Sequence, residues 1–215
     1  MIKTVFFDFD GTLFATEADI VESYRKTFAA LGMPSVPVRI GPPMAEALRQ
    51  IMPAISEAEL KRVGDTFVYT YDHSGYPNTY AYEGIPELLA VLAERGIDAV
   101  IATNKRVIPT ETILRQHQLR ERIRGVYSPD GFPGEKVDKA EAVRRAMRDL
   151  GRSRAECVMV GDTELDIRAG RQAGIRTIGV TWGYGRGGQP ALSCPDLLID
   201  RPEQLLLWLD GESER

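Results

Sequence analysis

Near its start the sequence reads Ile2-Lys3-Thr4-Val5-Phe6-Phe7-Asp8-Phe9-Asp10-Gly11-Thr12-Leu13. The part from Ile2 to Phe9 is short, apolar and rich in β-branched and aromatic residues, and Asp10-Gly11 is typical of a turn. We therefore predict a buried strand that ends in a turn. Strand periodicity places Asp8 and Asp10 on the same side of the chain, with phenylalanines on the other side.

Downstream of this run, the pattern changes from helical to alternating. From Glu17 to about Pro77 the spacing of apolar residues is helical, and no convincing strand occurs. After Tyr82, helices are predicted at 86–95, 109–117, 139–150, 164–173 and 203–209, and strands at 97–102, 126–127, 156–160, 176–180 and 197–199. Strands that alternate with helices of this length predict an α/β fold, with an open, Rossmann-like parallel sheet covered by helices on both faces.

Polar residues gather just after several of these strands. The first strand is followed by Asp8 to Leu13, a later one by Thr103-Asn104-Lys105, and another by Asp162 to Asp166, while Lys139 begins a helix. Ligands of open parallel sheets bind outside the carboxyl ends of the strands. Two carboxylates as close as those of the first motif repel each other, and Mg²⁺ is the simplest compensating cation. Carboxylates, a lysine and hydroxyl donors together suit a phosphoryl group.

In order and spacing, these pieces resemble the motifs of the haloacid dehalogenase superfamily over nearly the whole chain. The resemblance implies that Asp8 is the nucleophile of an aspartyl-phosphate intermediate and that Asp10 is the general acid and then the general base. It implies that Thr103 bonds the transferring phosphoryl group. Lys139 would steady both the nucleophile and the phosphate.

The same resemblance implies a Mg²⁺ site and a substrate pocket. Asp162 would hold the metal with Asp8 and the backbone carbonyl of Asp10, and Asp166 would stand behind these ligands and act on the metal through water. The expected substrate contacts are Gly11, Thr12, Thr103, Asn104 and Lys139. The domains expected are an α/β core of residues 1–14 and 82–215 and an inserted helical-bundle cap of residues 15–81, which would close over the site and select the leaving group.

Several motifs allow two interpretations. Lys136 and Lys139 both fit the lysine motif loosely, and Lys139 is favoured because residues at a helix start face the strand ends. Asp162 to Asp166 also fits a helix cap, which does not exclude metal binding. The stretch beginning at Gly41 is either a specificity loop of the cap or a simple helix entry. Gly183 to Gly188 matches a dinucleotide-binding pattern, but a proline follows it where a helix would have to begin.

Composition narrows the class of partner. The apolar share is 43%, the charged share 27% and the net charge -4, which fit a soluble globular protein and offer no basic footprint for nucleic acid. We find no apolar segment of membrane-spanning length and no secretory signal, so a cytoplasmic location is expected. The two cysteines suggest neither a disulfide framework nor a zinc site. A monomer or a homodimer is expected.

The leading functional hypothesis is a phosphatase for a small phosphorylated metabolite. Similarity of residues 179–185 and of the Thr103-Asn104-Lys105 run to phosphoglycolate-phosphatase-like members makes phosphoglycolate the first candidate, followed by a nucleoside monophosphate or a sugar phosphate. A β-phosphoglucomutase-like phosphotransferase is the alternative enzyme, although such relatives usually have valine where this chain has Thr12. A non-catalytic binding module is disfavoured, because Asp8, Asp10 and Asp162 are all present.

Overall fold

The computed structural model describes residues 1–38, 40, 42, 44–132, 134–135, 137–185 and 194–213. Contacts within the chain define two compact units. One, which we call the core unit, consists of Met1–Ala15 and Ala81–Arg215, and the other, the helical unit, of Thr16–Tyr80. Each unit is described by itself below.

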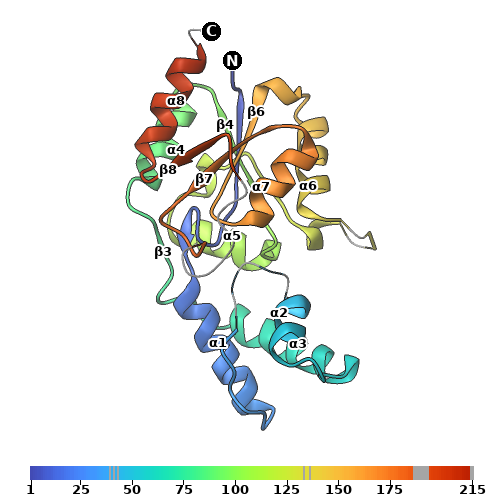
Figure 1. Cartoon of the computed structure of the whole chain (residues 1–215). Helices are drawn as coiled ribbons and strands as arrows, with labels where there is room; N and C mark the ends of the chain where they lie inside the picture. The colour runs from blue at the N-terminus through green and yellow to red at the C-terminus, as the bar shows by residue number, and fades with distance from the viewer. Residues whose placement is uncertain are drawn as a thin grey trace. The chain divides into compact units, whose positions relative to one another are not determined.

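A parallel sheet forms the centre of the core unit (Figure 1). Its six strands are β1 (Thr4–Phe7), β4 (Asp98–Ala102), β5 (Gly125–Tyr127), β6 (Cys157–Gly161), β7 (Arg176–Val180) and β8 (Leu197–Ile199). They lie in the order β5-β4-β1-β6-β7-β8. Two further short strands, β2 (Phe14–Ala15) and β3 (Tyr80–Ala81), form a separate two-stranded sheet that the sequence pattern did not predict. The predicted α/β class is confirmed.

The strand order creates a switch point beside β1. From β1 the chain continues to β4 and β5 on one side, whereas β6 is followed by β7 and β8 on the other side. β1 and β6 are direct neighbours, with Phe7 of β1 aligned with Val160 of β6. Helices that leave two neighbouring strands in opposite directions open a crevice at the carboxyl ends of those strands. The residues that follow β1 and β6 therefore lie where a ligand is expected.

Helices cover the sheet because both of its faces are apolar. The core unit contains α4 (Ile85–Glu94), α5 (Val107–Gln116), α6 (Lys139–Asp149), α7 (Glu164–Ala173) and α8 (Glu203–Ser213), and the short 3-10 turns Arg120–Arg122, Pro129–Gly131 and Arg154–Glu156. Figure 1 shows α6 and α7 on one side of the sheet and α4 and α8 on the opposite side. All four residues of β1 are buried, as expected for a central strand of a two-faced parallel sheet.

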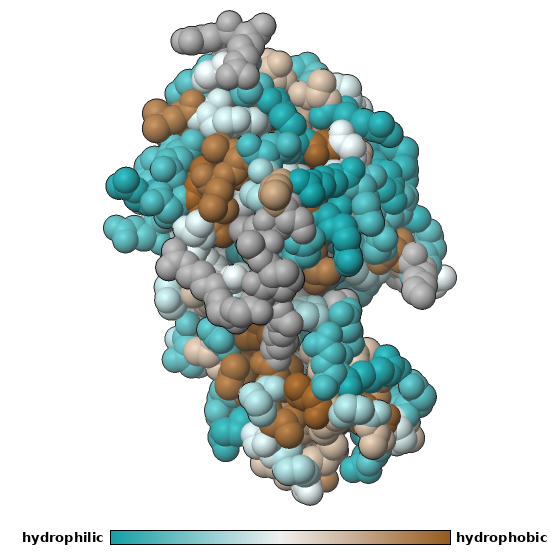
Figure 2. Space-filling view, viewed as in Figure 1, coloured by the Kyte–Doolittle hydropathy of each residue, from teal (hydrophilic) through white to brown (hydrophobic). Residues whose placement is uncertain are grey.

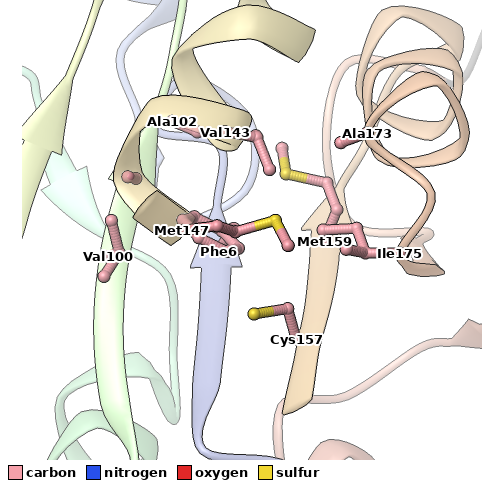
Figure 3. Close-up of a cluster of buried hydrophobic side chains, with 10 residues drawn as sticks. Phe6, Val100, Ala102, Val143, Met147, Cys157, Met159, Ala173 and Ile175 are labelled. Carbon is pink, nitrogen blue, oxygen red and sulfur yellow. The ribbon is translucent and has the colours of Figure 1, made fainter. Parts of the chain in front are cut away.

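One apolar cluster joins the sheet to α6 and α7. Met147 of α6 lies against Phe6 of β1, with Cys157 and Met159 of β6 beside them (Figure 3). Phe6 is completely buried, and burial of such a side chain is worth about 1.5–3 kcal/mol. This packing fixes α6 across β1, so the first residue of α6 lies near the residues that follow β1.

The helix boundaries differ from the predicted ones most at the end of α8 and at the start of α5. The helix α8, predicted to end at Leu209, continues to Ser213. The sequence placed Pro109 at the start, whereas α5 begins two residues earlier, at Val107. Pro109 is still in the first turn, where a backbone N–H has no partner within the helix, so the proline costs no hydrogen bond. The side chain of Asp130 accepts a hydrogen bond from the Val107 N–H at 3.1 Å, which stabilises the start of α5 at Val107.

The described part of the helical unit contains the helices α1 (Glu17–Ala30), α2 (Met44–Ile51) and α3 (Glu57–Asp72). Aromatic rings join α1 to α3, and the centroids of Tyr24 and Phe67 lie 4.2 Å apart. The buried carboxylate of Asp19 in α1 accepts hydrogen bonds from Asn78 and Thr79, which ties the end of the unit to its first helix. Of the stretch that begins at Gly41, both Gly41 and Pro43 lie outside the described residues.

Figure 2 shows that hydrophilic residues cover most of the visible face of the core unit, while hydrophobic residues gather on the visible face of the helical unit. Among the described residues, no helix combines the length and the apolar character needed to cross a membrane.

The packing of α7 against the sheet gives a stability test. A Cβ atom on Gly170 of α7 would lie 2.6 Å from Thr177 Cγ2 and 2.9 Å from Met159 Cβ. Gly170→Ala should therefore lower the free energy of unfolding by about 1–3 kcal/mol, the usual cost of overpacking. Gly211→Ala in α8 is the matched control, because its Cβ would meet nothing within 4 Å. Urea denaturation of both variants would contradict this packing if Gly170→Ala were as stable as the control.

Candidate active site

The residues that follow β1 and β6 bring two carboxylates together. Asp8 comes directly after β1, and its backbone N–H donates to the carbonyl of Val160 at 2.9 Å, which continues the pairing of the two strands. Asp162 comes directly after β6 and is completely buried. Both side chains therefore stand at the switch point of the sheet.

Lys139 pairs with the first of these carboxylates from the start of α6. Its Nζ lies 2.8 Å from Asp8 Oδ1 and 2.5 Å from Asp166 Oδ1. The Asp8 contact is an ion pair without the geometry of a hydrogen bond. Lys139 is thus one lysine that reaches the strand ends, as its position at a helix start suggested. The alternative, Lys136, lies outside the described residues.

Asp166 combines a structural contact with a site contact. Its Oδ2 accepts hydrogen bonds from the Thr163 backbone N–H at 2.9 Å and from the Thr163 hydroxyl at 2.7 Å. These bonds form the start of α7, and the other oxygen, Oδ1, meets Lys139. Asp166 therefore caps α7 with one carboxylate oxygen and faces the candidate active site with the other, so both interpretations of this motif can hold.

Asp162 is held by two hydrogen bonds from different loops. Thr12 Oγ1 donates to Oδ1 at 3.0 Å, and the backbone N–H of Tyr184 donates to Oδ2 at 2.7 Å. Thr12 is fully buried, and its hydroxyl orients Asp162; its predicted contact with substrate stays a prediction. Sequence reasoning did not find the contribution of Tyr184, because a backbone N–H leaves no signature in residue type.

Glycines make room for this arrangement. Gly11 has φ +83°, and a Cβ there would lie 2.3 Å from Asp162 Oδ2. Cβ atoms on Gly183 and Gly185 would lie 2.2 Å from the Gly11 carbonyl oxygen and 2.1 Å from the Asp162 carbonyl oxygen. Glycines near the end of a strand often mark a place where another backbone segment comes close. The loop that begins at Gly183, which matches a dinucleotide-binding pattern, uses its first two glycines to pack against Asp162 and its neighbours. Residues 186–188 of that pattern lie outside the described residues.

Asp10 is paired by a residue to which the sequence analysis assigned no role. Lys105 Nζ lies 3.0 Å from Asp10 Oδ1, and only 4% of the lysine side chain is exposed. The Lys105 backbone N–H donates to Thr103 Oγ1 at 3.2 Å. The hydroxyl proton of Thr103 can therefore be directed toward another acceptor. Asn104, predicted to contact substrate, is half-buried between these two residues.

Burial and mutual repulsion change the acidity of the site. Burial, followed by the charge of Asp166, raises the pKa of Asp8 to about 6, although Lys139 acts against the rise. Burial together with Asp166 and Asp8 raises the pKa of Asp162 to about 8. Burial acts to lower the pKa of Lys139, but Asp166 and Asp8 raise it overall. Burial lowers the pKa of Lys105, against the opposing effect of Asp10.

The carboxylates have the geometry of a cation site. Asp8, Asp162 and Asp166 each offer an oxygen, and these atoms lie within 4.8 Å of one another. One ammonium group, that of Lys139, faces two of these three buried acids. Hard oxygen donors with excess negative charge suit a divalent cation such as Mg²⁺. The donor set therefore fits a metal ion, which would relieve the repulsion that, after burial, raises the pKa of Asp8 and of Asp162.

Comparison with known proteins shows the family to which the chain belongs. The chain is 30% identical to the phosphoglycolate phosphatase of Photobacterium profundum, over 95% of this chain and 94% of that protein. It is 31% identical to the N-acetylmuramic acid 6-phosphate phosphatase of Pseudomonas aeruginosa, over 97% and 95% of the two chains. A haloacid dehalogenase-like family hydrolase from Streptococcus pneumoniae shares its fold with a TM-score of 0.85 at 23% identity, over 97% of this chain and 98% of that one. The family described as haloacid dehalogenase-like hydrolase matches residues 5–180, and the chain therefore belongs to that family.

Proposed function

We propose that this protein is a Mg²⁺-dependent hydrolase of a small phosphomonoester, that it works through an aspartyl-phosphate on Asp8, and that phosphoglycolate is its leading substrate. The observation that carries the proposal is the convergence of Asp8, Asp162 and Asp166 with Lys139 at the ends of β1 and β6. The similarity to a phosphoglycolate phosphatase over almost the whole length supports the substrate class.

The proposed metal ligands are the Asp8 and Asp162 carboxylates and the backbone carbonyl of Asp10, with Asp166 behind them. Bound Mg²⁺ would neutralise charge on the phosphoryl oxygens and lower the repulsion between phosphate and nucleophile. Thr12 and the Tyr184 N–H hold Asp162 in one orientation. Such supporting bonds fix the direction in which a carboxylate presents its lone pairs.

In the first half-reaction, an oxygen of Asp8 forms a bond to phosphorus while the ester P–O bond breaks. The electron pair of the broken bond stays on the ester oxygen, and a proton from Asp10 converts this oxygen to the alcohol. Lys139, 2.8 Å from Asp8, keeps the nucleophile ionised and oriented. The Thr103 hydroxyl donates a hydrogen bond to the phosphoryl group.

In the second half-reaction, a water oxygen bonds to phosphorus and gives its proton to the Asp10 carboxylate. The bond between phosphorus and Asp8 breaks, its electron pair returns to the Asp8 carboxylate, and inorganic phosphate leaves. Asp10 therefore gives up one proton and regains one over the whole cycle. The inserted helical unit is proposed to select the leaving group, since the residues above contact only the phosphoryl group and its oxygens.

A sugar phosphate is the second candidate substrate. The N-acetylmuramic acid 6-phosphate phosphatase is as similar to this chain as the phosphoglycolate phosphatase. Sequence identities of 30% and 31% therefore do not distinguish a two-carbon leaving group from a hexose leaving group. A nucleoside monophosphate and a phosphomutase reaction stay as further alternatives.

The roles of the two carboxylates are separable by substitution. Asp8→Asn should lower phosphate release from p-nitrophenyl phosphate by at least about 10³-fold, because it removes the nucleophile. Asp162→Asn should lower the rate and also raise the Mg²⁺ concentration needed for half-maximal activity. Asp98→Asn is the matched control, because that acid pairs with Arg152 at 2.7 Å at the other end of the sheet. Small and equal effects of the two site substitutions would overturn the assignment.

The raised pKa values predict how stability depends on pH. From an ordinary value of 3.8, Asp8 rises to about 6 and Asp162 to about 8 in the metal-free folded state. The folded protein then binds more protons than the unfolded chain in this window, so the free energy of unfolding should fall as the pH rises from about 4 to about 8. Asp162→Asn should reduce this decline, measured by urea denaturation in EDTA.

Added Mg²⁺ should reverse the decline at the upper end of the window, because the metal binds the deprotonated carboxylates. An unfolding free energy in EDTA that rises from about pH 4 to about pH 8, with the same slope in Asp162→Asn, would contradict the charged cluster.

The substrate proposal is tested by a panel of phosphomonoesters. Purified protein with Mg²⁺ should release phosphate fastest from phosphoglycolate, with N-acetylmuramic acid 6-phosphate, glucose 6-phosphate and nucleoside monophosphates as competitors. Conversion of β-glucose 1-phosphate to glucose 6-phosphate with a bisphosphate primer and without free phosphate would instead show a phosphomutase. The Asp8→Asn variant is the blank for contaminating phosphatases.

A further inference from the structure

A second buried lysine lies beside the proposed site and takes no part in the mechanism given above. Lys105 Nζ lies 3.0 Å from Oδ1 and 3.5 Å from Oδ2 of Asp10. The same ammonium group lies 5.8 Å from the ring centroid of Phe9. Lysine is almost never buried unless it is paired. The contact with Asp10 is therefore specific enough to restrict where the Asp10 carboxyl group can lie.

The backbone of Lys105 is fixed on both sides. Its N–H donates to Thr103 Oγ1 at 3.2 Å, and its carbonyl accepts a hydrogen bond from Ser128 Oγ at 2.7 Å. Ser128 Oγ also lies 2.7 Å from Asp130 Oδ1, so the two acceptors share its one hydroxyl proton, and Asp130 accepts the Val107 N–H at the start of α5. The loop after β4 is thus joined to the loop after β5, and its lysine is held rigidly relative to the sheet.

We propose that Lys105 is a positioning residue for Asp10, one that holds the carboxyl group where it can exchange a proton with the leaving oxygen. This inference rests on the proposed function. The turn after β4 then contributes to both sides of the bond that breaks, through Thr103 and Lys105. Thr103 meets the phosphoryl oxygens, and Lys105 directs the acid that meets the ester oxygen.

The role predicts a dependence on the leaving group. When the P–O bond to an alkyl ester breaks, the oxygen keeps the electron pair as a strongly basic alkoxide and needs the Asp10 proton. A p-nitrophenolate is a weak base and leaves without a proton. A misplaced Asp10 therefore slows transfer from alkyl phosphates far more than transfer from p-nitrophenyl phosphate.

The experiment compares kcat/KM for the best alkyl phosphate of the panel with kcat/KM for p-nitrophenyl phosphate. This constant reports the steps up to release of the alcohol and excludes the later hydrolysis, which both substrates share. In Lys105→Met, the alkyl value should fall by about 10²-fold, the cost of a small misplacement of a catalytic group, and the aryl value by less than about 10-fold. Equal losses for both substrates would overturn the proposal.

A double-mutant cycle separates this role from general support of the fold. In an Asp10→Asn background, Lys105→Met should change the ratio of alkyl to aryl kcat/KM no further, because both substitutions act on one proton transfer. A further change of similar size would show that Lys105 acts elsewhere. Lys105→Gln provides a second uncharged variant if the methionine variant does not fold, as judged by circular dichroism.

The matched control is Lys3→Met, which removes a lysine–carboxylate pair of 2.6 Å with Glu156, before the start of β1. It should leave both kcat/KM values unchanged. Failure of the underlying function looks different from failure of this inference. A wild-type protein that hydrolyses no phosphomonoester overturns both, whereas an active wild type with equal losses in Lys105→Met overturns the positioning role alone.

Discussion

The ion pairs of Lys139 with Asp8 and Asp166 are the interaction on which the rest of the site depends. They join the residue after β1, the first residue of α6 and the first turn of α7 through largely buried side chains. Removing one partner of a buried pair typically costs about 3–5 kcal/mol, because a charge is left without compensation. The same group that steadies the proposed nucleophile therefore also holds two helices at the end of the sheet.

The contacts of this site are far apart in the sequence. The Thr12 hydroxyl and the Asp162 carboxylate that it orients are separated by 150 positions. They meet because β1 and β6 are neighbours in the sheet, although the helical unit and two other strands of this sheet, β4 and β5, lie between them in the chain. Closing such a long loop has an entropic cost that only the packing of the whole core offsets. The site is thus a property of the complete core unit.

Much of this was predictable from the sequence, for physical reasons. Alternating strands and helices predicted the parallel sheet, and polar residues after the strands predicted which side chains meet. Asp8, Asp162 and Lys139 come together as expected. The hydrogen bonds between backbone and side-chain groups were not predictable. The N–H of Tyr184 that donates to Asp162 belongs to the backbone, so the residue type gives no sign of it. Lys105 was visible in the sequence, but its pairing with Asp10 depends on the loop geometry after β4.

The start of α5 and the strands β2 and β3 show another limit of structure prediction from sequence patterns. The helix begins before Pro109 because Asp130, from a different loop, accepts the Val107 N–H. The two short strands have two residues each, too few for a periodic pattern to form. In both cases a distant partner determines the local structure, and a pattern within one segment cannot contain that information.

The glycines around Asp162 have a consequence for how this protein can change. Because Gly11, Gly183 and Gly185 each stand where a Cβ would lie within 2.3 Å of the site's own atoms, any side chain at these positions would displace the Asp162 carboxylate or the backbone beside it. Mutational libraries aimed at this corner should return glycine at all three. Variation of this protein at the end of β6 is therefore confined to the residues around these three glycines.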